Sequence, residues 1–166
     1  MKIDLIQPFI SAVDAVLAET MQSPVTIGGL NMADEGYRKK GVAAMIAIKG
    51  AIEGRVILDM EPRAAARVAS YLAGEDITLN DQGMRETVSE LANMVIGNAV
   101  TLLNDRGSTY KVFPPEFISE EQLAQEGADT EATVLSFETP HGNVYMNIAM
   151  RYFRRRQRER STVAVT

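Results

Sequence analysis

The sequence contains no cysteine and only one histidine among its 166 residues. Disulfide bonds and cysteine-based catalysis are therefore excluded, and most zinc and transition-metal sites lack their usual ligands. Only carboxylate sites for hard cations stay open, and no ligand set for one is apparent, so we predict no metal site. The single histidine, His141, lies in the turn-rich string from Thr139 to Asn143, where we expect an ordinary exposed turn residue.

Nucleotide-binding patterns and long hydrophobic runs are missing as well. Neither G-x-x-x-x-G-K-[ST] nor G-x-G-x-x-G occurs, so no nucleotide site is predicted. No apolar run approaches the roughly 20 residues that span a membrane, and polar residues interrupt the N-terminal stretch where a signal peptide needs an apolar core. We therefore expect no membrane contact and, because cysteine is absent, a cytoplasmic location.

Positive charge is scarce in most of the chain and gathers at its C-terminus. Residues 1–150 hold 11 basic and 21 acidic side chains, a net charge of −10, whereas residues 151–166 hold six arginines and one glutamate, a net charge of +5. A body of that charge repels phosphate backbones, so we expect no nucleic-acid partner. We interpret the tail as a solvated terminus, with attachment to an anionic surface as the alternative.

The remaining composition, 46% hydrophobic and 23% charged, is typical of one soluble domain. We place this domain at residues 1–152 and an Arg-rich tail at 153–166. Short connections between the first three strands predict an antiparallel meander. The order of elements predicts an α+β fold in two layers, a largely antiparallel sheet of about six strands with three helices. The predicted elements are a helix at 4–21, strands at Val25–Asn31, Val42–Lys49 and Arg55–Met60, a helix ending at Gly74, a long helix from Asn80 or Asp81 to about Asp105, and strands at Lys111–Glu116, Thr133–Thr139 and Val144–Tyr152.

The long helix sorts its side chains onto two opposite stripes when it is turned by about 100° per residue. One stripe is apolar and is expected to pack on the sheet: Met84, Val88, Leu91, Val95 and Leu102. The other is expected to face water: Glu86, Glu90, Asn93, Gly97, Thr101 and Asn104. Asn93 and Gly97 are both unfavourable inside a helix, and Gly97 leaves a bare patch that another backbone can approach. We interpret the polar stripe as a docking surface in which Glu86 and Gly97 contact a partner.

The string Ser89-Glu90-Leu91-Ala92-Asn93-Met94-Val95-Ile96-Gly97-Asn98-Ala99 resembles the E-x-x-N helix of the CheC/CheX/FliY chemotaxis phosphatases. Its Gly-Asn-Ala ending and its single site per chain are most similar to CheX. The Arg-rich tail and the acidic stretch near 120–130 are not features of that family. The resemblance implies an enzyme that hydrolyses the aspartyl phosphate of a CheY-like response regulator, with Glu90 and Asn93 as the catalytic pair.

In that interpretation Asn93 orients the attacking water, because its amide both donates and accepts hydrogen bonds without carrying charge. Glu90 suits an ion pair with a lysine of the regulator. The chain needs no cofactor of its own, and Mg²⁺ is expected on the regulator. The resemblance also implies a homodimer joined through the sheet, for which we took the proline-free run Val144–Met150 as the exposed edge. Two alternatives stay open: a non-catalytic regulator-binding or flagellar-switch-like module, and an adaptor that acts through the Arg tail.

Overall fold

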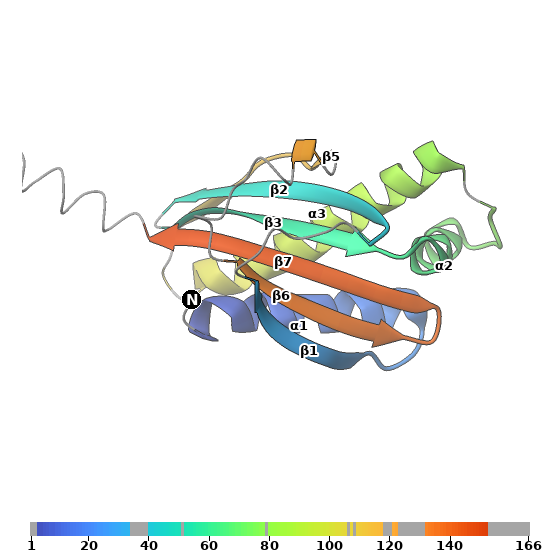
Figure 1. The fold of residues 1–166 in the computed structure, drawn as a ribbon, viewed down its shortest axis with the longest axis horizontal. Coiled ribbons are helices and arrows are strands. Elements are labelled where there is room, and N and C mark those ends of the chain that lie inside the picture. The colour runs from blue at the N-terminus through green and yellow to red at the C-terminus, as the bar shows by residue number, and fades with distance from the viewer. Residues whose placement is uncertain are drawn as a thin grey trace, which may run out of the picture.

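The structure is a computed structural model that describes residues 3–33, 40–50, 52–78, 80–105, 107, 109–117, 121–122 and 132–152. Within these ranges the chain forms three helices and one seven-stranded sheet, and Figure 1 shows their arrangement. The elements are α1 (Ile3–Met21), β1 (Thr26–Ala33), β2 (Val42–Gly50), β3 (Ile52–Met60), α2 (Pro62–Ala73), α3 (Asp81–Asp105), β4 (Tyr110–Val112), β5 (Glu116–Phe117), β6 (Ala132–Thr139) and β7 (Gly142–Tyr152).

The strands lie in the order β1-β6-β7-β3-β2-β4, with β5 also paired to β2, and every pairing is antiparallel. Helices α1 and α3 lie behind this sheet in Figure 1, and α2 lies at its end. Alternate strand residues point toward the helices and form the core with them, including Ile46, Leu58, Phe137 and Met146. The two-layer α+β prediction is therefore confirmed.

The predicted meander is wrong for its first strand. β2 and β3 form a hairpin, but β1 pairs with β6 at the far edge of the sheet. Three antiparallel strands separate β1 from β2, so the two run in the same direction. The buried carboxylate of Asp59 in β3 accepts backbone hydrogen bonds from Lys40 at 2.6 Å and Gly41 at 2.9 Å, and these bonds hold the chain at the start of β2.

The predicted strand Lys111–Glu116 is also wrong in detail, because it is two short strands. β4 and β5 flank Phe113-Pro114-Pro115, and both pair with β2. A proline has no N–H to donate to a ladder, so two in a row interrupt the pairing. The sheet consequently has seven strands where about six were expected.

The helix boundaries follow from the capping residues that the sequence provides. Pro62 is the first residue of α2, and Gly74 ends it with a left-handed φ of 74°. The side chain of Asn80 caps α3 by accepting a hydrogen bond from the backbone N–H of Gly83 at 2.7 Å.

Helices α1 and α2 are tied by polar contacts near the end of α1. The Tyr71 hydroxyl donates to Glu19 at 3.3 Å, and Arg67 donates to the Gln22 side chain at 3.3 Å. The negative charge of Glu19 disfavours a second anion beside it and thereby raises the pKa of Tyr71.

Candidate active site on α3

Helix α3 has 25 residues and places the predicted site on the side turned away from the core. Val88, Leu91 and Val95 are fully buried, as predicted, and Met84 is half-buried. Leu102 is an exception, because 40% of it is exposed while its neighbour Leu103 is buried. The buried face is wider than the predicted stripe, since α1 covers one flank of α3 and the sheet covers the other. The buried face therefore includes residues outside the predicted stripe, such as Ala92, Ile96 and Ala99.

The polar stripe is exposed along its whole length: Glu86, Glu90, Asn93, Gly97, Thr101 and Asn104 all face solvent. Glu90 and Asn93 are neighbours on this stripe because residues three apart lie on the same side of a helix. Within the described part of the chain, neither side chain makes a hydrogen bond or an ion pair. Both groups are thus available to a partner or a water molecule.

Two other members of the stripe have local hydrogen bonds. Glu86 accepts one from the side chain of Gln82 at 3.1 Å, and this contact orients its carboxylate on the surface. Asn104 accepts one from the backbone N–H of Tyr110 at 3.0 Å, which links the end of α3 to the start of β4. Asn104 therefore has a structural role. The carboxylate of Glu86 remains exposed on the same side of the helix as Glu90.

Gly97 has open space around it. A Cβ atom added at this position would meet no other atom within 4 Å, apart from the backbone of its own helix turn. The Thr101 hydroxyl donates back to the Gly97 carbonyl at 2.9 Å, so the helix continues without interruption past the glycine. No internal packing requires a glycine here, and the bare patch that the sequence predicted is present.

An aromatic side chain lies beside α3 that the sequence did not predict there. Arg85 of α3 lies 5.6 Å from the ring centroid of Phe117 in β5, and Phe117 is 47% exposed. The Pro114-Pro115 pair indicates a break in the predicted strand, and allowing for it could have separated β5 from β4. Phe117 lies beside α3 because β5 pairs with β2, and no local sequence pattern predicts that pairing.

Other predicted features have mixed outcomes. His141 lies in the β6–β7 turn, as expected, but it is half-buried instead of exposed. Over the described ranges, no three His, Asp or Glu side chains are grouped so that they could hold a metal ion, and no helix is long and apolar enough to cross a membrane. The Arg-rich tail 153–166 and nearly all of the acidic stretch 120–130 lie outside the described residues.

The fold and the exposed Glu90–Asn93 pair define a class of antiparallel α+β proteins that present one surface carboxylate–amide pair on a long helix. The family model described as "Chemotaxis phosphatase CheX" matches residues 42–138, more than half of the chain. The chain therefore belongs to the CheX family, which confirms the resemblance drawn from the α3 sequence.

Solved structures agree with this membership. CheX from Borrelia burgdorferi, solved in a complex with CheY, BeF3 and Mg²⁺, is 30% identical, with a TM-score of 0.72 over 90% of this chain and 99% of that chain. A CheC-like superfamily protein from Shewanella sp. PV-4 has a TM-score of 0.76 at 23% identity, covering 91% of this chain and 99% of that chain. CheX from Desulfovibrio desulfuricans has a TM-score of 0.73 at 20% identity over 89% and 99%. The last two similarities concern the fold alone. A search of curated proteins finds no match.

Proposed function

We propose that this protein hydrolyses the aspartyl phosphate of a CheY-like response regulator and that Glu90 and Asn93 form its catalytic pair. The observation that carries the proposal is the exposure of both side chains, adjacent on α3 and without partners in the described part of the chain, in a member of the CheX family. A convex helical surface suits a protein substrate, because the helix can be inserted into the regulator's own active site.

The chemistry requires positioning more than a strong nucleophile. An acyl phosphate is already activated, so the enzyme must hold a water molecule in line with the phosphorus atom. The amide of Asn93 can accept a hydrogen bond from that water and donate another, and it adds no negative charge near the phosphoryl oxygens. A carboxylate in its place would be repelled by those oxygens.

Glu90 lies one turn earlier and serves to fix the register of the complex. Its carboxylate is free to pair with a cationic side chain of the regulator, and Glu86 and the bare surface at Gly97 extend the contact along the same stripe. The Borrelia burgdorferi CheX complex contains CheY and Mg²⁺. This supports a regulator as partner and a magnesium ion that belongs to the regulator, with no cofactor held by this chain.

A non-catalytic module is the alternative function. The fold alone does not decide between the two functions, because the FliM structure from H. pylori, solved in a complex with SpeE, still has a TM-score of 0.57 at 13% identity. Such a module would bind the phosphorylated regulator without accelerating loss of its phosphate. The two functions can therefore be distinguished by the rate at which the phosphorylated regulator releases phosphate.

The experiment is phosphate release from a phosphorylated regulator of the same organism, with and without this protein. Wild-type protein should accelerate release, and Asn93→Ala should reduce that acceleration by roughly 100-fold or more, because the positioned water is lost. Binding of the regulator should persist in Asn93→Ala. Glu90→Ala should lower activity mainly by weakening or misplacing the complex. Both sites are exposed, so the free energy of unfolding should change by only about 0.5–1 kcal/mol.

Asn98→Ala is the matched control. Asn98 is exposed on the same helix but lies about 140° around it from Asn93 at 100° per residue, so it should retain wild-type activity. If Asn93→Ala is as active as wild type, the role assigned to Asn93 is wrong. If the wild-type protein binds the phosphorylated regulator without accelerating release, the non-catalytic module is the correct function.

A further inference from the structure

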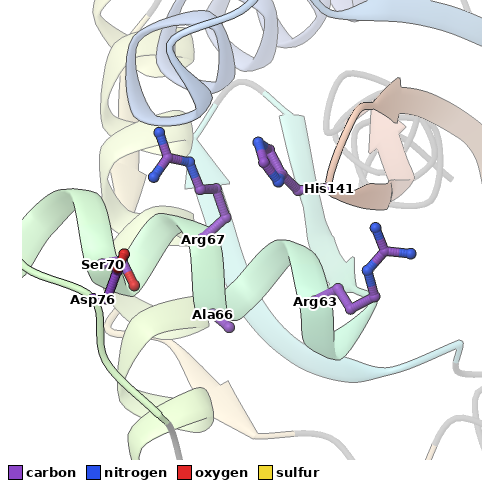
Figure 2. Close-up of a pocket in the computed structure, with 6 residues that line it drawn as sticks. All are labelled: Arg63, Ala66, Arg67, Ser70, Asp76 and His141. Carbon is purple, nitrogen blue, oxygen red and sulfur yellow. The ribbon is translucent and has the colours of Figure 1, made fainter.

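A polar pocket lies away from the catalytic helix, between α2 and the β6–β7 turn. Its volume is about 270 Å³, and its lining residues are Arg63, Ala66, Arg67, Ser70, Asp76 and His141. Figure 2 shows the imidazole of His141 between the guanidinium groups of Arg67 and Arg63. None of these lining residues belongs to α3, so the pocket is separate from the Glu90–Asn93 surface.

The two arginines of this pocket are neighbours, and neither forms an ion pair within the described residues. Arg63 and Arg67 are four residues apart on α2, a spacing at which like charges destabilise a helix. Asp76 also lines the pocket, but no ion pair joins its carboxylate to either arginine in the described part of the chain. The repulsion between Arg63 and Arg67 is therefore not offset by an ion pair to another described residue.

The hydrogen bonds of the two arginines are incomplete too. A guanidinium has five N–H donors. Arg67 makes one hydrogen bond to the neutral amide of Gln22 at 3.3 Å, and its Nε is buried without an acceptor. Arg63 makes no hydrogen bond to another described residue. Buried donors are nearly always paired in folded proteins, so the missing acceptor is a feature to be explained.

We propose that this pocket binds the phosphate group of a small soluble anion. Arginine forks match phosphate oxygens in geometry, and their hydrogen bonds to phosphate are strengthened by charge. His141 offers a ring nitrogen between the two guanidiniums, and phosphate oxygens can accept from several sides, whereas a carboxylate presents two oxygens in one plane. The volume of about 270 Å³ has room for a phosphate group, and the pocket is open to solvent.

The rest of the chain makes this site selective. The net charge of residues 1–150 is −10, so anions are repelled from most of that part of the chain, and Arg63 and Arg67 form a local exception; the six arginines of residues 151–166 are a second basic segment. The proposal is independent of the phosphatase function, because none of the pocket's residues takes part in the reaction proposed for α3.

The test uses inorganic phosphate and glycerol 3-phosphate as probes on the full chain. Each is titrated into ¹⁵N-labelled protein while backbone amide shifts are followed, against sodium chloride of equal ionic strength. Saturable shifts should appear at Ser70, Asp76 and His141 with the phosphate probes and not with chloride. Arg63→Gln, an exposed substitution that should leave folding intact, should raise the dissociation constant by about tenfold or more, and Arg67→Gln should do the same.

Arg85→Gln is the matched control, because it removes the same charge from an exposed position on α3. It should leave the dissociation constant unchanged. The proposal is overturned if neither phosphate probe gives saturable shifts at the pocket. It is also overturned if Arg63→Gln binds like wild type, or if Arg85→Gln weakens binding as much as Arg63→Gln does, since the effect would then be general screening.

Discussion

Gly97 is the residue at which local stability and the proposed function are most clearly opposed. A glycine inside a helix costs about 1 kcal/mol relative to alanine. At this position nothing inside the protein requires it, since an added Cβ would meet no atom within 4 Å. A residue that lowers stability without a packing reason is expected where the surface must stay open to a partner.

Gly97→Ala should therefore stabilise the isolated protein. We expect the free energy of unfolding in urea to rise by about 0.5–1 kcal/mol, because alanine has the higher helix propensity and no clash arises. Gly97→Leu should fold as well, yet bind the phosphorylated regulator more weakly, because its side chain covers the open patch.

Gly41→Ala is the opposite case and serves as a control. Its added Cβ would collide with the backbone carbonyl of Met60, so this variant should be destabilised. A Gly97→Ala variant that loses stability would contradict the open surface at α3. A Gly97→Leu variant that binds the regulator normally would remove Gly97 from the docking surface.

The exposure of the site residues was predictable from the sequence, because it follows from helical periodicity alone. Glu90 and Asn93 lie where turning the helix by 100° per residue places them. Leu102 was misplaced, because which flank of a helix is buried depends on its neighbours, here α1. The Arg63–Arg67–His141 pocket was not predicted at all. Its residues come from two segments some 75 positions apart in the chain, and only the fold brings His141 to α2.

At the scale of elements, the start of α3 depends on one side chain. Asn80 accepts a hydrogen bond from Gly83 at 2.7 Å, and without it the first turn of α3 has free N–H groups. Asn80→Ala should lower the free energy of unfolding by about 1 kcal/mol, measured by urea denaturation. The first turn also precedes Glu86, so fraying there should weaken regulator binding more than it slows the catalysed step.

Gln82→Ala provides the comparison within the same turn. It removes the exposed hydrogen bond to Glu86 but leaves the cap intact, so stability should change by less than about 0.5 kcal/mol. Equal losses in the two variants would show that Asn80 does not act as a cap.

Capping residues made the helices predictable, whereas strand pairing was only partly so. Pro62, Gly74 and Asn80 act within their own turns, and their helices begin and end where expected. The β2–β3 hairpin follows from a short connection. The place of β1 beside β6 does not, because register and neighbour choice depend on which hydrophobic faces meet across the whole sheet.

For the whole molecule, the last described strand, β7, ends at Tyr152; Arg151 belongs to it, and five further arginines follow it in the sequence. The tail has no apolar periodicity, so we expect it to contribute little to the core. A chain that ends after Tyr152 should unfold at nearly the same temperature as the full chain and keep the proposed phosphatase activity. A large drop in the unfolding temperature would show that the tail packs on the domain.

The strand predicted as the exposed edge of a homodimer is not an edge of the sheet. The predicted edge Val144–Met150 lies in β7, which is in the middle of the sheet, paired with β3 and β6. The real edges are β1 on one side and β4 with β5 on the other. Among the side chains that the structure describes, the exposed large apolar ones at the two edges are Val112, Phe113 and Phe117 at the β4–β5 edge and Ile27 in β1.

A dimer joined through the sheet is therefore expected at the β4–β5 edge. Light scattering at micromolar concentration should give the mass of two chains. Val112→Lys should shift the protein toward monomer, because a charge at an edge strand opposes pairing. Ile27→Lys, at the opposite edge, should leave the dimer intact. A monomeric wild-type protein would refute the dimer, and dissociation by Ile27→Lys alone would place it at β1. Because the exposed stripe of α3 belongs to neither edge strand, the monomeric variant should retain its activity toward the phosphorylated regulator.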